Sequence, residues 1–130
     1  MSKKSRGINA ERDLIHKFWG AGWASLRAAG SGSSQFPNPD ILCSNNLRKL
    51  GLEVKLTTES RKYFTNKEIN DLKYFCDKFG AEAWVGVKFF RKEWVFFMLE
   101  DLQSSGNNFV VTQELSDLKG LNFEELIGLH

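Results

Sequence analysis

The sequence predicts a single α/β domain, residues 1–130, in which a central mixed β-sheet is flanked by α-helices. Three observations lead to this prediction. The chain has 130 residues, and 42% of them are hydrophobic, which is enough for one buried core. Two segments carry apolar residues at helical spacing, and short apolar runs typical of strands surround them. Such an alternation of helices and strands is typical of helices packed on a sheet.

The helix signals are strongest in residues 8–19 and 66–79. In both segments the apolar side chains recur three and four positions apart, and a glycine follows the last of them. Thr65 and Glu68 precede the second stripe at the spacing of a capping box. A short third helix is expected at residues 122–129.

Short apolar runs bounded by turn residues predict the strands. A loop rich in Gly, Ser and Pro separates the first two runs, and Asn45 and Asn46 separate the next pair. Asparagine tolerates the positive φ of a tight turn, so a hairpin is expected there. Residues 57–64 are polar and basic, and no strand is predicted in them. The predicted strands are residues 23–29, 40–44, 47–56, 81–90, 93–99 and 109–112.

The charge is unevenly distributed along the chain. Residues 1–66 carry a net charge of +6 and residues 67–130 a net charge of −4, and residues 1–7 form a basic arm that is expected to be mobile. A basic half favours a surface that binds a polyanion. The alternative is a chance asymmetry on a solvated surface.

Composition also indicates where the protein works. Cys43 and Cys76 lie in apolar contexts without the spacing of metal ligands, so we expect small buried side chains and no disulfide. No apolar run is long enough to span a membrane, and no signal peptide is recognisable. We therefore expect a cytoplasmic protein without a membrane partner, in a prokaryotic cell or a cell infected by a virus or phage.

The candidate site lies in the stretch PNPDILCSNNLRKLGLEVK, residues 37–55. Side chains alternate between the two faces of a strand, so Glu53 and Lys55 share one face. Asp40 begins the preceding strand and can point to the same side if the two strands pair. The alternative is a surface ion pair of Glu53 and Lys55 on a half-exposed strand.

Glu11 lies on the apolar stripe of the first predicted helix, where a carboxylate is costly unless it is paired or binds a metal. The alternative is an acid in the first turn, favoured by the helix dipole. Glu11, Asp40 and Glu53 are thus expected to converge and to repel one another unless a cation joins them. An all-oxygen ligand set suits Mg²⁺. Lys55 beside the ion can orient or deprotonate a water, or stabilise charge at phosphorus.

The motif Pro39-Asp40 followed by Glu53-Val54-Lys55 resembles the signature of the PD-(D/E)xK nuclease superfamily. Within it, the chain resembles the archaeal-type Holliday junction resolvases over nearly its whole length. The matching segments are GINAERDLIHKFWGAGW, RAAGSGS, NPDIL, LEVKL and SGNNFVVTQELSDLKGLNFEELIGL. The resemblance implies a restriction-endonuclease-like core.

The resemblance also implies roles for individual residues. It assigns Glu11, Asp40, Glu53 and the Val54 carbonyl to Mg²⁺, for which Mn²⁺ is expected to substitute, and it makes Lys55 the catalytic lysine. A catalytic loop serine of the family matches Ser31. Ser33 is the nearest alternative to Ser31, because the Gly-Ser repeat allows the match to shift along the chain. A further alternative is that Ser31 belongs to an ordinary flexible loop.

Basic residues are the expected DNA contacts. Arg12 and Arg27 match family arginines near phosphates, and three more basic residues belong to the N-terminal arm. Arg61 and Lys62 could hold a phosphate of the DNA backbone, or they could lie in a solvated linker. The full predicted set is Lys3, Lys4, Arg6, Arg12, Arg27, Arg61 and Lys62.

The strands at 81–90 and 93–99 are apolar on both faces. Their aromatic residues either lie between layers of the chain's own elements or form a homodimer interface. The resemblance favours the dimer, as does a substrate with two symmetric cleavage positions. The aromatic residues in question are Trp84, Phe89, Phe90, Trp94, Phe96 and Phe97.

These observations predict a Mg²⁺-dependent endonuclease that resolves four-way DNA junctions by paired symmetric nicks, as a homodimer. It would recognise junction shape and phosphates more than base sequence. Other recombination or replication proteins are further expected partners. Two alternatives stay open: a general nuclease of the same superfamily that acts on other DNA structures, and a DNA-binding module without catalysis.

Overall fold

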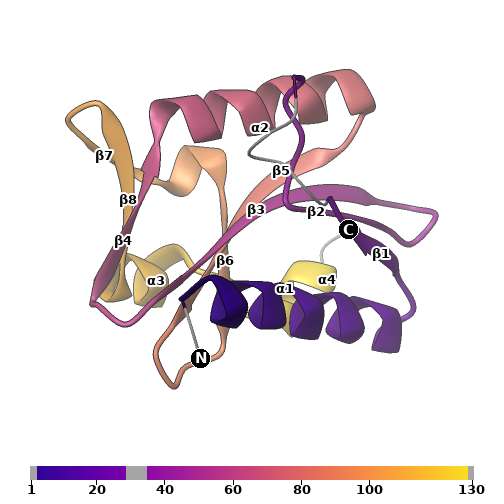
Figure 1. Ribbon diagram of the computed structural model, residues 1–130, viewed down its shortest axis with the longest axis horizontal. Coiled ribbons are helices and arrows are strands. Elements are labelled where there is room, and N and C mark those ends of the chain that lie inside the picture. The colour runs from indigo at the N-terminus through magenta and orange to yellow at the C-terminus, as the bar shows by residue number, and fades with distance from the viewer. Residues whose placement is uncertain (1–2, 29–34, 129–130) are drawn as a thin grey trace.

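A five-stranded sheet in the order β1-β2-β3-β5-β6 runs through the middle of the molecule (Figure 1). The computed structural model describes residues 3–28 and 35–128. β3 and β5 are parallel, and the other neighbouring strands are antiparallel. The mixed sheet predicted from the sequence is therefore confirmed. Its strands are β1 (Ala24–Arg27), β2 (Ile41–Ser44), β3 (Lys49–Thr57), β5 (Glu82–Phe89) and β6 (Trp94–Met98).

Helices cover both faces of this sheet. α1 (Lys3–Gly20) and α4 (Phe123–Ile127) lie below it in Figure 1, and α2 (Asn66–Phe79) lies above it. Each side has its own apolar core, because the sheet separates the two sets of side chains. The core on the α1 side includes Leu14, Phe18, Leu52 and Phe123, and the core on the α2 side includes Leu72, Val85 and Phe97.

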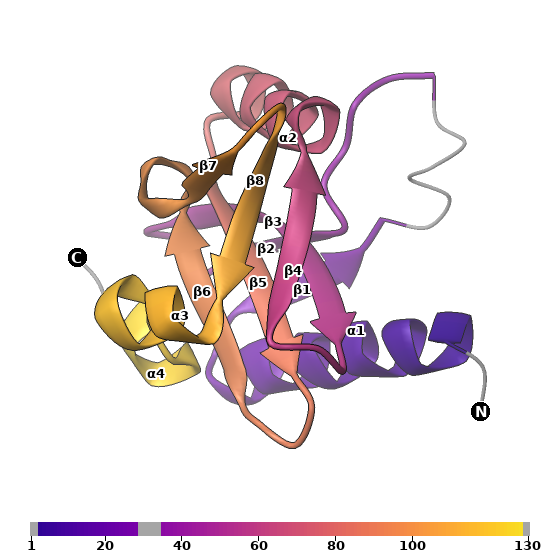
Figure 2. The ribbon, with the colours of Figure 1, turned by 90° about the vertical axis from the view of Figure 1, so that its left-hand side faces the viewer.

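A second, three-stranded sheet lies in front of the large one in Figure 2, in the order β4-β8-β7. The polar stretch 57–64 predicted no strand, yet β4 forms there. Phe64 is fully buried and stands opposite Phe109 across the β4–β8 pair. Long-range pairing thus outweighs local composition. The elements not predicted are β4 (Arg61–Thr65), η2 (Leu99–Asp101), β7 (Gln103–Ser105) and α3 (Gln113–Lys119), and β8 (Asn108–Thr112) was expected.

β3 presents its two faces to different layers, as alternation requires. Leu50, Leu52 and Val54 are buried in the core on the α1 side. Gly51 faces α2 so closely that a Cβ atom there would lie 2.6 Å from the sulfur of Cys76. Glu53 follows Gly51 by two positions, so it lies on the α2 face of the sheet.

The β2–β3 hairpin closes through its asparagines, as predicted. Asn46 has a φ of 78°, and the Asn45 Oδ1 atom accepts hydrogen bonds from the backbone N–H of Leu47 and Arg48. The strand begins at Lys49 rather than at residue 47, because these contacts belong to the turn.

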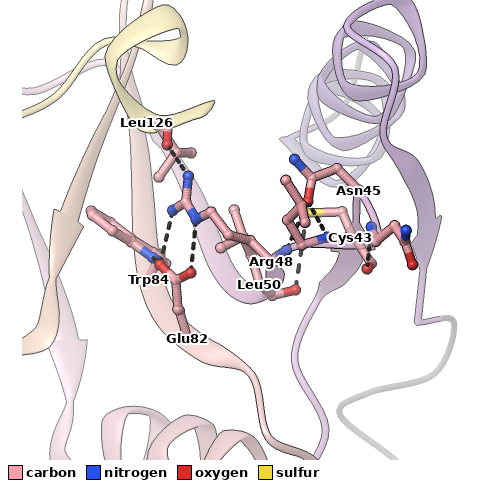
Figure 3. Close-up of polar contacts among 10 residues, drawn as sticks. Cys43, Asn45, Arg48, Leu50, Glu82, Trp84 and Leu126 are labelled. Carbon is pink, nitrogen blue, oxygen red and sulfur yellow. Dashed lines mark hydrogen bonds and ion pairs between the residues drawn. The ribbon is translucent and has the colours of Figure 1, made fainter. Parts of the chain in front are cut away.

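Arg48 joins this hairpin to two other elements (Figure 3). Its guanidinium donates two hydrogen bonds of 2.8 Å to the Glu82 carboxylate of β5 and one of 2.7 Å to the Leu126 carbonyl of α4. It also lies 5.6 Å from the centre of the Trp23 ring. The short C-terminal helix is thereby held to the sheet that carries the candidate site.

Two expectations about the ends and surfaces of the chain are wrong. Residues 3–7, expected in a separate arm, are part of α1. The aromatic residues of β5 and β6 are covered by the chain's own layers, and only Phe90 is exposed, at 61%. They therefore give no support to a dimer interface. The buried residues are Trp84, Phe89, Trp94, Phe96 and Phe97.

Cys43 and Cys76 are buried free thiols, as predicted. Within the described ranges, none of the helices is both long and apolar enough to cross a membrane.

Candidate active site

Asp40 and Glu53 lie together because β2 and β3 pair. The backbone N–H of Asp40 donates to the Leu52 carbonyl at 2.9 Å, and Ile41 is the cross-strand partner of Leu52. The Asp40 side chain in turn accepts a hydrogen bond of 3.0 Å from the backbone N–H of Val54. The Asp40 carboxyl group is thus fixed across the strand position of Glu53, and the two carboxyl groups hydrogen-bond to each other.

The pKa values of both carboxyl groups are raised above their usual values. Burial, followed by the negative charges of Asp40 and Glu68, raises the pKa of Glu53 to about 8. Burial also raises the pKa of Asp40, because the Val54 N–H only partly offsets the loss of hydration. At neutral pH the metal-free pair therefore holds a proton.

The ammonium group of Lys55 pairs with Glu68 of α2. Its ammonium nitrogen lies 2.8 Å from the Oε2 atom of Glu68 and 3.0 Å from the Oε1 atom. The ring of Phe64 is 5.2 Å away. The alternative of a surface ion pair between Glu53 and Lys55 is not what the structure shows, because the partner of Lys55 is Glu68.

Sequence reasoning gave Glu68 only a capping role. The capping box is present: Thr65 Oγ1 accepts from the Glu68 N–H, and Glu68 accepts from the Thr65 N–H. Burial would raise the pKa of Glu68, but hydrogen bonds from Lys55 and Thr65 outweigh it and hold the pKa below its usual value. Glu68 reaches Lys55 because α2 starts directly after β4 and packs over β3, the strand that carries Lys55. The sequence did not indicate this contact because β4 was not predicted.

Glu11 reaches the same region from α1. α1 begins at Lys3 and has no acid in its first turn, so the first-turn alternative for Glu11 is wrong. Its Oε2 atom lies 3.6 Å from the Nε atom of Arg27. Burial and then the negative charge of Asp40 raise the pKa of Glu11, although Arg27 opposes this shift. The Glu11 carboxylate is therefore within electrostatic range of Asp40 while it pairs with Arg27.

The oxygen donors fit a hard divalent cation in their chemistry. Asp40 and Glu53 are neighbouring half-buried carboxyl groups, and burial is the main cause of their raised pKa values. A divalent ion would stabilise their charged forms, and carboxylate oxygens are ligands that Mg²⁺ accepts. Across residues 3–28 and 35–128, however, no three His, Cys, Asp or Glu side chains are already grouped as a metal site. Glu11 instead pairs with Arg27.

The predicted DNA contacts spread over three elements in the described part of the chain, α1, β1 and β4. Arg6 and Arg12 are exposed on α1, while Arg61 is exposed and Lys62 half-buried at the start of β4. Arg27 is half-buried at the end of β1. Other predicted residues fall outside the description, namely Ser31 and Ser33, together with the side chains of Lys3 and Lys4.

Known proteins with the same sequence pattern and fold are available for comparison. The model of the archaeal Holliday junction resolvase (Hjc) family matches residues 2–130. A crossover junction endodeoxyribonuclease Hjc of Archaeoglobus fulgidus is 42% identical over 96% of this chain and 91% of its own length. The Hjc of Sulfurisphaera tokodaii is 30% identical over 97% of this chain and 88% of its own.

A solved structure indicates the same family as the sequence comparisons. The structure of Archaeoglobus fulgidus Hjc, a Holliday junction resolvase from an archaeal hyperthermophile, superimposes with a TM-score of 0.88 at 39% identity. It covers 94% of this chain and 100% of the other. The resemblance seen in the sequence motifs is thus confirmed over the whole domain, and the chain belongs to the archaeal Holliday junction resolvase family.

Proposed function

We propose that this protein is a metal-dependent endonuclease that cuts four-way DNA junctions. One observation carries the proposal: in a chain of this family, Asp40 and Glu53 lie side by side and half-buried, with Lys55 on the next position of the same strand face. A binding module has no need of two adjoining acidic groups and a lysine held together in this way.

Asp40 and Glu53 would hold Mg²⁺ or Mn²⁺, with Glu11 and the Val54 carbonyl completing the protein ligands. When bound, the ion supplies a water of lowered pKa and neutralises charge on the phosphate. The protein's part is to fix the donors: the Val54 N–H orients the Asp40 carboxylate, and strand pairing sets its distance from Glu53. Release of Glu11 toward the ion would free Arg27 for a phosphate.

Lys55 would be the catalytic lysine, whose ammonium stabilises charge at the attacked phosphate. Ser31 or Ser33 would act from the loop before β2. Arg6, Arg12 and the other basic residues named above would contact the DNA backbone. Such contacts position the substrate without reading bases, so recognition would depend on junction shape.

The active form would be a homodimer, because a junction with two-fold symmetry has two equivalent cleavage positions. The buried aromatic residues of β5 and β6 cannot form its interface, but α2 offers another surface. Tyr74 and Phe79 are 56% and 49% exposed there, and Phe75 stacks on Phe79 with the ring centres 5.2 Å apart. Exposed aromatic residues in a cluster are typical of interfaces.

The proposed setting is the cytoplasm of a prokaryotic cell or of an infected cell, beside recombination or replication proteins.

The proposed function is tested by cleavage of an immobile four-way junction, a linear duplex of the same sequence and a flap, each in Mg²⁺ and in Ca²⁺. We expect paired nicks in the four-way junction but not in the duplex or the flap, and only when Mg²⁺ is present. Equal cutting of all three substrates would show a general nuclease, and junction binding without cleavage would show a binding module.

A further inference from the structure

Glu68 is a fourth carboxylate at the candidate site and comes from α2. Its negative charge acts on both of those carboxyl groups. Its own contact is with the lysine: both carboxylate oxygens lie within 3.0 Å of the Lys55 ammonium. The side chains of Lys55 and Glu68 are 23% and 29% exposed, so the pair is partly shielded from water.

The Lys55 ammonium is held from two directions. Glu68 contacts it from α2, and the buried ring of Phe64 lies 5.2 Å from it on β4. A lysine side chain has many rotamers, and each partner that fixes the ammonium removes part of this freedom before substrate binds. Placement of a catalytic group in advance lowers the barrier of the chemical step.

The Glu68 carboxylate is itself fixed by the start of α2. Its Oε1 atom accepts hydrogen bonds from the Thr65 backbone N–H at 2.9 Å and from the Thr65 hydroxyl at 3.2 Å. The capping box thus does two things. It satisfies backbone donors at the helix terminus, and it orients a carboxylate toward the lysine on β3.

We propose that Glu68 is a positioning residue for DNA cleavage, which holds the Lys55 ammonium where the phosphate will be attacked. Glu68 acts through Lys55 and needs no contact with DNA or metal. Because it assumes that Lys55 is the catalytic lysine, this role rests on the function proposed above. The capping contacts make the role separable from stability, since glutamine also supports a capping box.

The test compares three variants with the parent protein in single-turnover cleavage of a four-way junction. Glu68→Gln keeps an oxygen for the cap and removes the charge beside Lys55. Glu125→Gln is the matched control, because Glu125 forms the same capping box with Asn122 at α4. Thr65→Ala removes the hydroxyl contact to the Glu68 carboxylate and keeps the backbone N–H contact.

The cleavage rate of Glu68→Gln is expected to fall by about ten- to a hundredfold, with unchanged junction affinity and unfolding midpoint. Glu125→Gln should cleave at the parent rate. Thr65→Ala should lose thermal stability and cleave at a rate between those of the parent and Glu68→Gln, since one of the two Thr65 contacts that orient Glu68 persists. Parent-like cleavage by Glu68→Gln would overturn the proposal.

A double variant tests whether Glu68 acts through Lys55. In a Lys55→Ala background, Glu68→Gln is expected to cause no further loss. A further loss of the same size would overturn the positioning role. So would recovery of the parent rate by Glu68→Gln at higher Mg²⁺, because that result would make Glu68 a metal ligand. Full cleavage by Lys55→Ala alone would instead overturn the proposed function, and the positioning role with it.

Discussion

The carboxylate of Asp40 accepts a hydrogen bond of 3.0 Å from the backbone N–H of Val54, the residue between Glu53 and Lys55. This contact joins the residue before β2 to the middle of β3. It keeps the Asp40 carboxylate against Glu53 even though both groups are acidic and half-buried. The geometry of the site is therefore built into the sheet before any ion or DNA binds, and several consequences can be measured.

The metal-free protein should lose stability as the pH rises from 6 to 8.5. Glu53 has a pKa of about 8 in the folded chain against 4.5 for an ordinary glutamate, so the folded state binds more protons than the unfolded state in this range. Stability then falls with rising pH, on the order of 2 kcal/mol. Asp40 acts in the same direction because its pKa is also raised.

Urea unfolding in EDTA at the two pH values measures this effect. The Glu53→Gln variant is the control, since it lacks the titrating group and should show a smaller fall. Mg²⁺ at millimolar concentration should restore part of the stability of the parent protein at pH 8.5, because it binds the folded state. A stability that is constant or rises over this range would contradict the buried carboxyl pair.

Removal of Arg48 should destabilise the fold without touching the site residues. Arg48→Ala leaves the Leu126 carbonyl and the Glu82 carboxylate without their guanidinium donor, and a loss of roughly 2–3 kcal/mol in unfolding free energy is expected. Arg48→Lys should recover only part of it, because an ammonium cannot reproduce the two-pronged contact. Lys73→Ala removes an exposed pair with Asp77 and should leave the unfolding free energy nearly unchanged. Equal losses in Arg48→Ala and Lys73→Ala would contradict the role of Arg48.

Gly51 should tolerate no side chain while Cys76 stays in place. A Cβ atom would meet the Cys76 sulfur at 2.6 Å, so Gly51→Ala is expected to lower the unfolding free energy by about 1–3 kcal/mol. The double variant with Cys76→Ala removes that sulfur and should regain part of the loss. Thermal unfolding of the three variants measures both effects, and a double variant no more stable than expected from additive losses would place the clash elsewhere.

The dimer proposed on α2 should depend on Phe79. Phe79→Asp introduces a charge among the exposed aromatic residues and should shift sedimentation toward the monomer at micromolar concentration. Phe90→Asp is the matched control, because Phe90 is also exposed, at 61%, but lies at the end of β5. A parent protein that is monomeric at every concentration, or two variants that behave alike, would contradict this interface.

Much of the architecture follows from local sequence signals. The capping box at Thr65, the turn at Asn46 and the alternation along β3 are all in the structure as the sequence indicates. These features depend on residues close together in the chain, whose preferences are set by backbone geometry and spacing. The pairing of Asp40 with Glu53 follows as well, because a short hairpin leaves little choice of register.

Other features depend on residues far apart and gave no local signal. β4 is polar except for Phe64, and it is a strand because β8 pairs with it. Without β4, the position of Glu68 over Lys55 could not be anticipated. The aromatic residues of β5 and β6 indicate burial correctly, but their pattern cannot tell whether the covering layer belongs to the same chain or to a partner.

The most direct test of the central claim compares Asp40→Asn with Asp13→Asn in cleavage of a four-way junction. Asparagine can still accept the Val54 hydrogen bond, so the fold should persist while the metal ligand is lost. Asp13 is an exposed acid on α1 and serves as the control. We predict that Asp40→Asn binds the junction like the parent protein but cleaves at least about a hundredfold more slowly, whereas Asp13→Asn cleaves normally. Parent-like cleavage by Asp40→Asn would contradict the assignment of Asp40 and Glu53 as the catalytic centre.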